Sequence, residues 1–221
     1  RNLFLKMSKS AGLLDYLNPE LLKTTLELAR LFQDAGGNLL MVGGSVRDLI
    51  WREYPKELDF EARGLSVEEI KSLLSPHFKC NEVGKAFGVL KIKGQPIGIA
   101  LPRTEIKTGS RHKGFSIDVD PNLPFEEAVL RRDFTINALG LNPLTDELFD
   151  PCRGRQDIAD RKLSHVGPAF KEDPLRVLRG MQFIARFQLT PKPSTIDICQ
   201  SMDMENLAPE RIYEEWKKLI L

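Results

Sequence analysis

Three carboxylates stand at alternate positions early in the chain, at Glu57, Asp59 and Glu61. The stretch "ELDFEARG" alternates them with apolar residues, which predicts a strand over 57–64 with one apolar and one acidic face. Carboxylate oxygens are ligands that Mg²⁺ prefers, and a pair of them beside a phosphate site suits metal-assisted phosphoryl transfer. The alternative for the pattern alone is a surface strand with a solvated acidic face.

A glycine pair precedes this acidic strand by one short connection. In "LLMVGGSVRD", residues 39–48, an apolar run passes directly into Gly43 and Gly44. Without side chains there, backbone N–H groups can approach phosphate oxygens, and a helix beginning at Ser45 would add its N-terminal dipole. Arg47 then supplies a planar fork of donors. A tight turn with a surface ion pair is the alternative, but the nearby acidic strand favours a site.

The elements that must position these residues follow from periodicity and end signals. The order of the expected helices and strands predicts an α+β head over residues 1–163, followed by an all-helical extension over 164–221. Helices are expected at 19–34, 66–74, 173–187, 194–204 and 209–220, and strands at 39–43, 57–64, 79–83, 87–93 and 96–102.

Composition excludes several classes of protein. The 221 residues are 42% hydrophobic, enough to bury a core, and 32 Lys and Arg balance 31 Asp and Glu, so any anion site must come from local placement. No apolar run approaches the roughly 18 residues of a membrane span, so we expect a cytoplasmic protein with no membrane partner. The spacing of three Cys and three His argues against a disulfide framework and a zinc site.

Ordered motifs over residues 40–187 resemble the class II family of tRNA nucleotidyltransferases (CCA-adding enzymes) and bacterial poly(A) polymerases. The resemblance implies a polymerase-β-like nucleotidyltransferase head, with a small mixed or antiparallel sheet and helices, followed by a helical neck. The motifs are "MVGGSVRDLIWREYPKELDF", "ALPRTEIKTGSRHKGF", acids at 126 and 127, "RRDFTINAL", "DPCRGRQDI" with "HVGPAF", and "EDPLRVLR".

The resemblance implies that Glu57 and Asp59 are the catalytic carboxylates and that they bind Mg²⁺. The family usually has Asp at the first position, so Glu57 is a departure. Glu61 resembles an extra acid that some members carry on the same strand, and Asp59 with Glu61 stays open as the metal pair.

The glycine motif and "RRDFTINAL" carry the implied phosphate contacts. Gly44 and Arg47 match positions that bind the incoming triphosphate, and Arg132 matches another nucleotide contact. Asp133 and Asn137 are expected to hold the ribose or to brace the site.

"EDPLRVLR" carries the implied base selection. Asp173 and Arg176 match residues that present hydrogen-bonding groups to the incoming base, and Arg179 matches a further nucleotide-binding arginine. Asp173 before Pro174 is alternatively an ordinary helix cap. Gln182 stands where family members often carry another arginine.

The implied function is template-independent RNA nucleotidyl transfer, adding C, A or both to the 3′ end of tRNA from CTP and ATP, with release of pyrophosphate. A poly(A) polymerase, or an enzyme that adds only CC or only A, shares these motifs. An inactive RNA-binding remnant is the alternative from another class. The basic stretch from Arg103 to Lys113 is expected either to contact phosphates or to be a solvated loop.

Overall fold

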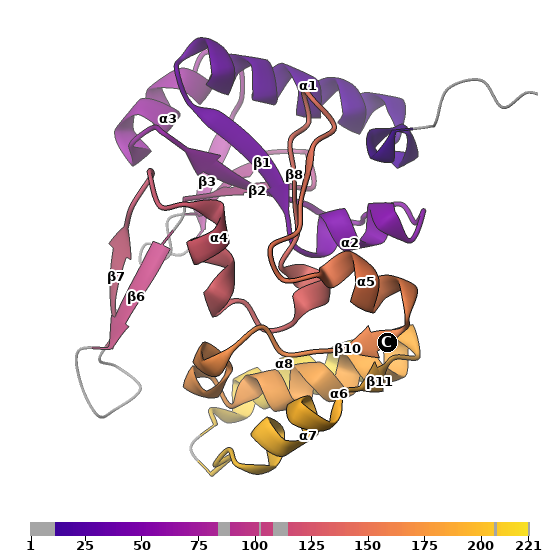
Figure 1. Ribbon diagram of the computed structural model, residues 1–221. Coiled ribbons are helices and arrows are strands. Elements are labelled where there is room, and N and C mark those ends of the chain that lie inside the picture. Colours follow the sequence, from indigo (N-terminus) through magenta and orange to yellow (C-terminus); the bar gives the residue numbers. More distant parts are fainter. Residues whose placement is uncertain (1–11, 84–88, 102, 108–114, 206, 221) are drawn as a thin grey trace, which may run out of the picture.

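The centre of the molecule is a seven-stranded sheet (Figure 1). The computed structural model describes residues 12–83, 89–101, 103–107, 115–205 and 207–220. Neighbouring strands pair antiparallel except β2 and β5, which are parallel, so the predicted mixed sheet is confirmed. Their order is β3 (Cys80–Val83), β4 (Val89–Ile92), β5 (Ile97–Ala100), β2 (Leu58–Arg63), β1 (Asn38–Val42), β8 (Gly140–Leu141) and β9 (Leu148–Phe149).

The strand β1 is buried on both faces, as its unbroken apolar run requires. Leu39 and Met41 pack in the main core, which includes residues of helix α1 (Pro19–Asp34). Leu40 and Val42 face the other way and pack in a smaller cluster with Phe125. The end of β1, where the glycine pair follows, is therefore held from both sides.

Helices cover the sheet and form one end of the molecule (Figure 1). Asn18 caps α1 as predicted, because its Oδ1 accepts a hydrogen bond from the Leu21 N–H at 2.8 Å. Helices α6 (Leu175–Phe187), α7 (Pro193–Gln200) and α8 (Pro209–Ile220) gather at the end remote from α1. The other helices of the described residues are α2 (Gly44–Ile50), α3 (Val67–Leu74), α4 (Phe125–Ala128) and α5 (Gly154–Ala159).

Two stretches differ from the expected elements. The first part of the basic stretch is a strand, β6 (Arg103–Lys107), paired antiparallel with β7 (Phe115–Val119), and not a loop. Over residues 125–140 the sequence pattern is helical, whereas the structure has the short helix α4 followed by two 3₁₀ turns, at Val129–Arg131 and Thr135–Asn137. Extended backbone at Arg132 and Phe134 separates these turns.

Head and neck share packing across the predicted boundary at residue 163. Strand β10 (Lys162–Leu163) pairs with β11 (Thr190–Pro191), and the Phe134 ring lies 5.3 Å from Phe170 and 5.6 Å from Phe183 between centroids. The division into two domains stays a prediction. None of the described helices is long and apolar enough to cross a membrane.

Candidate active site

The predicted site residues converge on one cavity of about 530 Å³. Glu57 and the alternative metal ligand Glu61 are absent from the cavity's lining. The others come from α2, β2, the 3₁₀ segment after α4, the turn before α6, and α6 itself; they are Gly44, Arg47, Asp59, Arg132, Asp173, Arg176 and Arg179.

A buried hydroxyl ties the glycine turn to the acidic strand. Ser45 Oγ donates to the Glu57 carbonyl at 3.1 Å and accepts from the Asp59 N–H at 2.9 Å. Ser45 is only 3% exposed. Its bonds to both acidic residues fix where β2 begins relative to α2. Sequence reasoning missed this residue, although a hydroxyl directly after the glycine pair was a visible signal.

The charge of Glu57 acts on the other expected metal-binding carboxylate, Asp59. Partial desolvation and then the negative charge of Glu57 raise the pKa of Asp59, against the opposing charges of Arg132 and Lys91. Within the described residues, no ion pair is formed by Glu57 or Asp59. A cation between two such carboxylates would relieve their repulsion.

Glu61 has a different environment from the other two acids. Its side chain is 10% exposed, and the carboxylate accepts a hydrogen bond from Arg63 Nη1 at 2.5 Å. Glu61 therefore already has a cationic partner from the protein. No group of three or more His, Cys, Asp or Glu suited to a metal ion occurs in the described part of the chain.

The glycine pair leaves room for two guanidinium groups. Gly43 has φ 73° and ψ −134°, a conformation that side chains disfavour, and a Cβ there would lie 3.0 Å from Arg132 Nη1. A Cβ on Gly44 would lie 3.4 Å from Arg47 Nη2. The turn is thus lined by arginine donors on its cavity side.

Arg47 is buried, contrary to the alternative of a surface ion pair. Its Nε and Nη2 donate to Asp48 Oδ1 at 3.0 and 2.7 Å, and its Nη1 donates to Asn137 Oδ1 at 2.7 Å. The guanidinium also lies over the Phe187 ring, 4.5 Å from its centroid. Burial lowers the pKa of Arg47, and the charge of Asp48 partly offsets this. The arginine is therefore held in one orientation from three sides.

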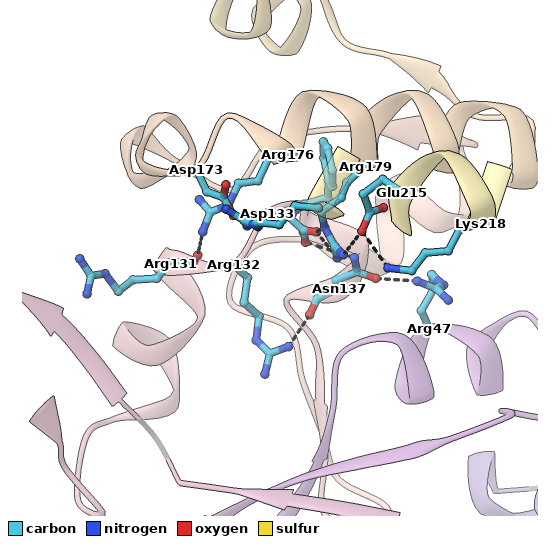
Figure 2. A network of polar contacts seen from close by, with 12 residues as sticks. Arg47, Arg131, Arg132, Asp133, Asn137, Asp173, Arg176, Arg179, Glu215 and Lys218 are labelled. Carbon is cyan, nitrogen blue, oxygen red and sulfur yellow. Dashed lines mark hydrogen bonds and ion pairs between the residues drawn. The ribbon is translucent and has the colours of Figure 1, made fainter. Parts of the chain in front are cut away.

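A buried ion pair joins the head to α6 (Figure 2). Asp133 Oδ2 accepts from Arg179 Nε and Nη2 at 2.8 and 2.6 Å, while Oδ1 accepts from Asn137 Nδ2 and the Phe134 N–H. Burial alone would raise the pKa of Asp133, but the Arg179 charge and these hydrogen bonds hold it below its ordinary value. Asp133 is thus a brace, one of the two roles expected for it.

Helix α8 contributes charged residues that sequence reasoning did not place in the site. Arg211 Nη2 donates to Asp173 Oδ2 at 2.8 Å. Glu215 is 5% exposed, accepts from Lys218 Nζ at 2.7 Å and lies 3.7 Å from Arg179 Nη1 (Figure 2). All three α8 residues line the cavity.

The expected base-selecting pair has protein partners. Besides its ion pair, Asp173 accepts from the Leu175 N–H through Oδ1 at 3.2 Å, so the carboxylate also bonds the first residue of α6. Arg176 donates to the carbonyl oxygens of Ala169 and Arg131. Both side chains are therefore held in place at the cavity wall.

Two buried polar atoms of cavity-lining residues have no hydrogen-bond partner in the described part of the chain. They are Gln182 Nε2, a donor, and Glu215 Oε2, an acceptor. Gln182 is 2% exposed. Buried polar groups are almost always paired in folded proteins, so a polar ligand is a natural partner for them. The side chains of the basic stretch from Arg103 to Lys113 lie outside the described residues.

Comparison with known proteins identifies the family of this chain. Residues 39–164 match the Poly A polymerase head domain. A Multifunctional CCA protein of Xanthomonas campestris is 36% identical over 189 residues, covering 82% of this chain and 45% of the relative. That of Stenotrophomonas maltophilia is 37% identical over 190 residues, covering 83% and 46%. The chain thus spans about half the length of the curated relatives it matches.

Solved structures agree with the fold. The CCA-adding enzyme of Bacillus stearothermophilus in complex with CTP superposes with a TM-score of 0.77 at 25% identity, covering 92% of this chain and 49% of that one. The Thermotoga maritima CCA-adding enzyme complexed with tRNA_CCA gives 0.76 at 22% identity, covering 94% and 49%, a likeness of fold. Fold and cavity define a nucleotidyltransferase head of the polymerase-β-like class. Within that class, the chain belongs to the tRNA nucleotidyltransferase and poly(A) polymerase family.

Proposed function

We propose that this chain carries out template-independent nucleotidyl transfer, adding C and A to the 3′ end of tRNA from CTP and ATP. The observation that carries the proposal is the cavity that brings Asp59 together with five arginines of the motifs. The names of the relatives support it, since they are CCA proteins and a CCA-adding enzyme in complex with CTP. The cytoplasmic location expected from the sequence stays a prediction.

The carboxylates of Glu57 and Asp59 suit a divalent cation, which we propose to be Mg²⁺. They provide hard oxygen ligands, and neither forms an ion pair with a cationic side chain of the described residues. Glu61 is the weaker candidate because Arg63 already pairs with it. When bound, the ion would neutralise phosphate charge and acidify the attacking hydroxyl.

The protein residues have separate roles in this proposal. Arg132, with the backbone of Gly44, holds the triphosphate, and the buried Arg47 fixes the wall behind it. Asp133 keeps Arg179 turned toward the nucleotide. The 3′ oxygen of the RNA bonds to the α-phosphorus as the bond to the β-phosphate oxygen breaks. Pyrophosphate leaves, and the hydroxyl proton passes to solvent.

Selection of the base falls to Asp173 and Arg176 in this proposal. Cytosine and adenine both carry an amino donor beside a ring-nitrogen acceptor, whereas guanine and uracil carry a carbonyl beside a ring N–H. A carboxylate acceptor beside a guanidinium donor therefore matches the first two bases and leaves buried groups unpaired with the others.

The test is incorporation of labelled CTP and ATP into tRNA that lacks its CCA end. Asp59→Asn should reduce incorporation by about 1000-fold or more, because it removes a carboxylate from the reacting centre. Glu61→Gln is the matched control and should keep most activity. Full activity of Asp59→Asn would overturn the assignment. If Glu61→Gln loses activity while Glu57→Gln retains it, the metal pair is Asp59 and Glu61.

A further inference from the structure

A separate cavity of about 360 Å³ lies where helix α3 meets strands β3 and β4. Its lining shares no residue with the catalytic cavity. The roles proposed so far for the motif residues leave it without a ligand.

This cavity lies on the opposite face of the sheet from Asp59. In the strand register Asp59 of β2, Gly98 of β5 and Lys91 of β4 stand in one row, so their side chains share a face. Leu90, the next residue of β4, points to the other face, where it packs in the core and lines the cavity. An occupant of this cavity is therefore not the nucleotide that reacts at Asp59.

The floor of the cavity is apolar and partly aromatic. Leu74 and Leu90 are buried, and Phe78 is partly buried against the same core. The Phe78 N–H donates to the Leu74 carbonyl at 2.8 Å, so the chain turns back over the end of α3 and brings the ring beside Leu74. An apolar floor with an aromatic ring suits the face of a nucleobase.

The rim of the cavity is cationic. Lys71 and Lys79 line it, and no carboxylate of the described residues does. The Lys93 N–H donates to the Lys79 carbonyl at 2.8 Å, which brings a further exposed lysine next to the rim.

The sequence around the cavity carries a local excess of positive charge. Between residues 71 and 93 one acidic residue, Glu82, stands against five lysines, although basic and acidic residues balance over the whole chain. The lysines are Lys71, Lys79, Lys85, Lys91 and Lys93. A local cluster of positive charge is the electrostatic signature of a phosphate-binding surface.

We propose that this cavity binds a nucleotide of an RNA strand at a position other than the reacting 3′ end, with the base on the apolar floor and a phosphate at the lysines. The choice of RNA rests on the proposed function, whose substrate is an RNA. Three strand spacings of about 4.8 Å separate β2 from β3, so one RNA molecule can reach both Asp59 and the cavity. A free nucleotide offers the same chemistry, and the experiments separate the two sources.

The thiol of Cys80 reports directly on occupancy, because Cys80 lines the cavity. Cys152 and Cys199, which are also partly buried, line neither cavity and serve as internal controls. Alkylation of each thiol by N-ethylmaleimide is followed by mass spectrometry on the unmodified protein, alone, with CTP, or with tRNA lacking its CCA end.

At a tRNA concentration about ten times its Kd, alkylation of Cys80 should slow at least about fivefold, while CTP should change it less than about twofold. The two control thiols should keep their rates. An unchanged Cys80 rate with tRNA, equal protection of all three thiols, or protection of Cys80 by CTP alone would overturn the proposal.

Replacing single lysines tests the phosphate contact through its salt dependence. Lys71→Gln and Lys79→Gln change exposed side chains, and Lys23→Gln on α1 is the matched control, because Lys23 is exposed and lines neither cavity. Each cavity variant should bind tRNA about threefold more weakly, and the slope of log affinity against log salt should become shallower by about 0.7, the value for one phosphate of a single strand. A slope equal to that of Lys23→Gln in both variants would overturn the proposal.

Incorporation of CTP and ATP into the same tRNA separates this inference from the proposed function. Incorporation without protection of Cys80 would refute the cavity assignment alone. Protection of Cys80 without incorporation would refute the proposed function alone.

Discussion

Replacing Asp133 by Asn should destabilise the protein by removing the charge from a buried ion pair. The Asp133 side chain is 8% exposed and that of Arg179 is 33% exposed, with donor to acceptor distances of 2.8 and 2.6 Å. Removing one partner of a buried pair costs about 3 to 5 kcal/mol. Because Arg179 keeps some solvent and Asn still accepts hydrogen bonds, we expect a loss of about 2 kcal/mol at pH 7.

The effect should also depend on pH in a defined direction. The pKa of Asp133 is lower in the folded protein than its ordinary value, so between these two values the unfolded chain binds more protons. The stabilisation from Asp133 is thus complete above the ordinary carboxyl pKa of about 4 and is lost as the pH falls through the lower, folded value. The Asn variant lacks this titration, so its deficit relative to the natural chain should shrink in acid.

Urea unfolding followed by circular dichroism at pH 7 and at pH 3 measures both effects. Glu172→Gln is the control, since Glu172 pairs with Arg131 near the surface and should contribute less than about 1 kcal/mol. A deficit for Asp133→Asn below about 0.5 kcal/mol at pH 7 would refute the reasoning. A deficit that grows toward pH 3 would refute it equally.

Three further substitutions test single contacts in the site. Ser45→Ala removes the hydroxyl that accepts a hydrogen bond from the Asp59 N–H, and should lower kcat at least about tenfold. The loss of unfolding free energy should be only about 1 to 2 kcal/mol, as expected for a buried hydrogen bond. An unchanged kcat would show that this contact does not position the carboxylate. Gln182→Met removes a buried donor that has no partner among the described residues, and should weaken CTP binding in titration without lowering the melting temperature. Unchanged CTP affinity would contradict a nucleotide contact. Arg211→Ala releases Asp173 from its ion pair and should raise the ratio of UTP to CTP incorporation. Arg211→Lys should give an intermediate ratio. An unchanged ratio would exclude a role of this ion pair in base selection.

The local patterns predicted much of what positions the site. The apolar run before Gly43 is strand β1, and the alternation around Asp59 is strand β2. The spacing of apolar residues, helix caps and turns are local properties, so neighbouring residues alone indicate them. The convergence of the motifs was implied by the family resemblance, since spacing along the chain cannot show that Arg179 meets Asp133.

The parts that were not predicted depend on long-range packing. Apolar periodicity places Trp216 on the same face of α8 as other large residues, yet Trp216 is 43% exposed while Glu215 is buried in the site. The burial of Glu215 arises because Arg179 and Lys218 surround its carboxylate, and neither partner is visible from the helical pattern. Similarly, Arg103–Lys107 forms a strand because β7 pairs with it, whereas its basic composition indicated a loop.

The composition of the product distinguishes CCA addition from each alternative activity. Purified protein is incubated with Mg²⁺ and tRNA lacking its CCA end, with CTP alone, ATP alone or both, and the 3′ ends are sequenced. We expect two C residues with CTP alone and a complete CCA with both nucleotides. An adenosine tail would indicate a poly(A) polymerase. Addition of CC alone or of A alone would indicate an enzyme that adds only those nucleotides. No extension by the folded protein, with RNA binding retained, would contradict the proposed function and indicate an inactive RNA-binding remnant.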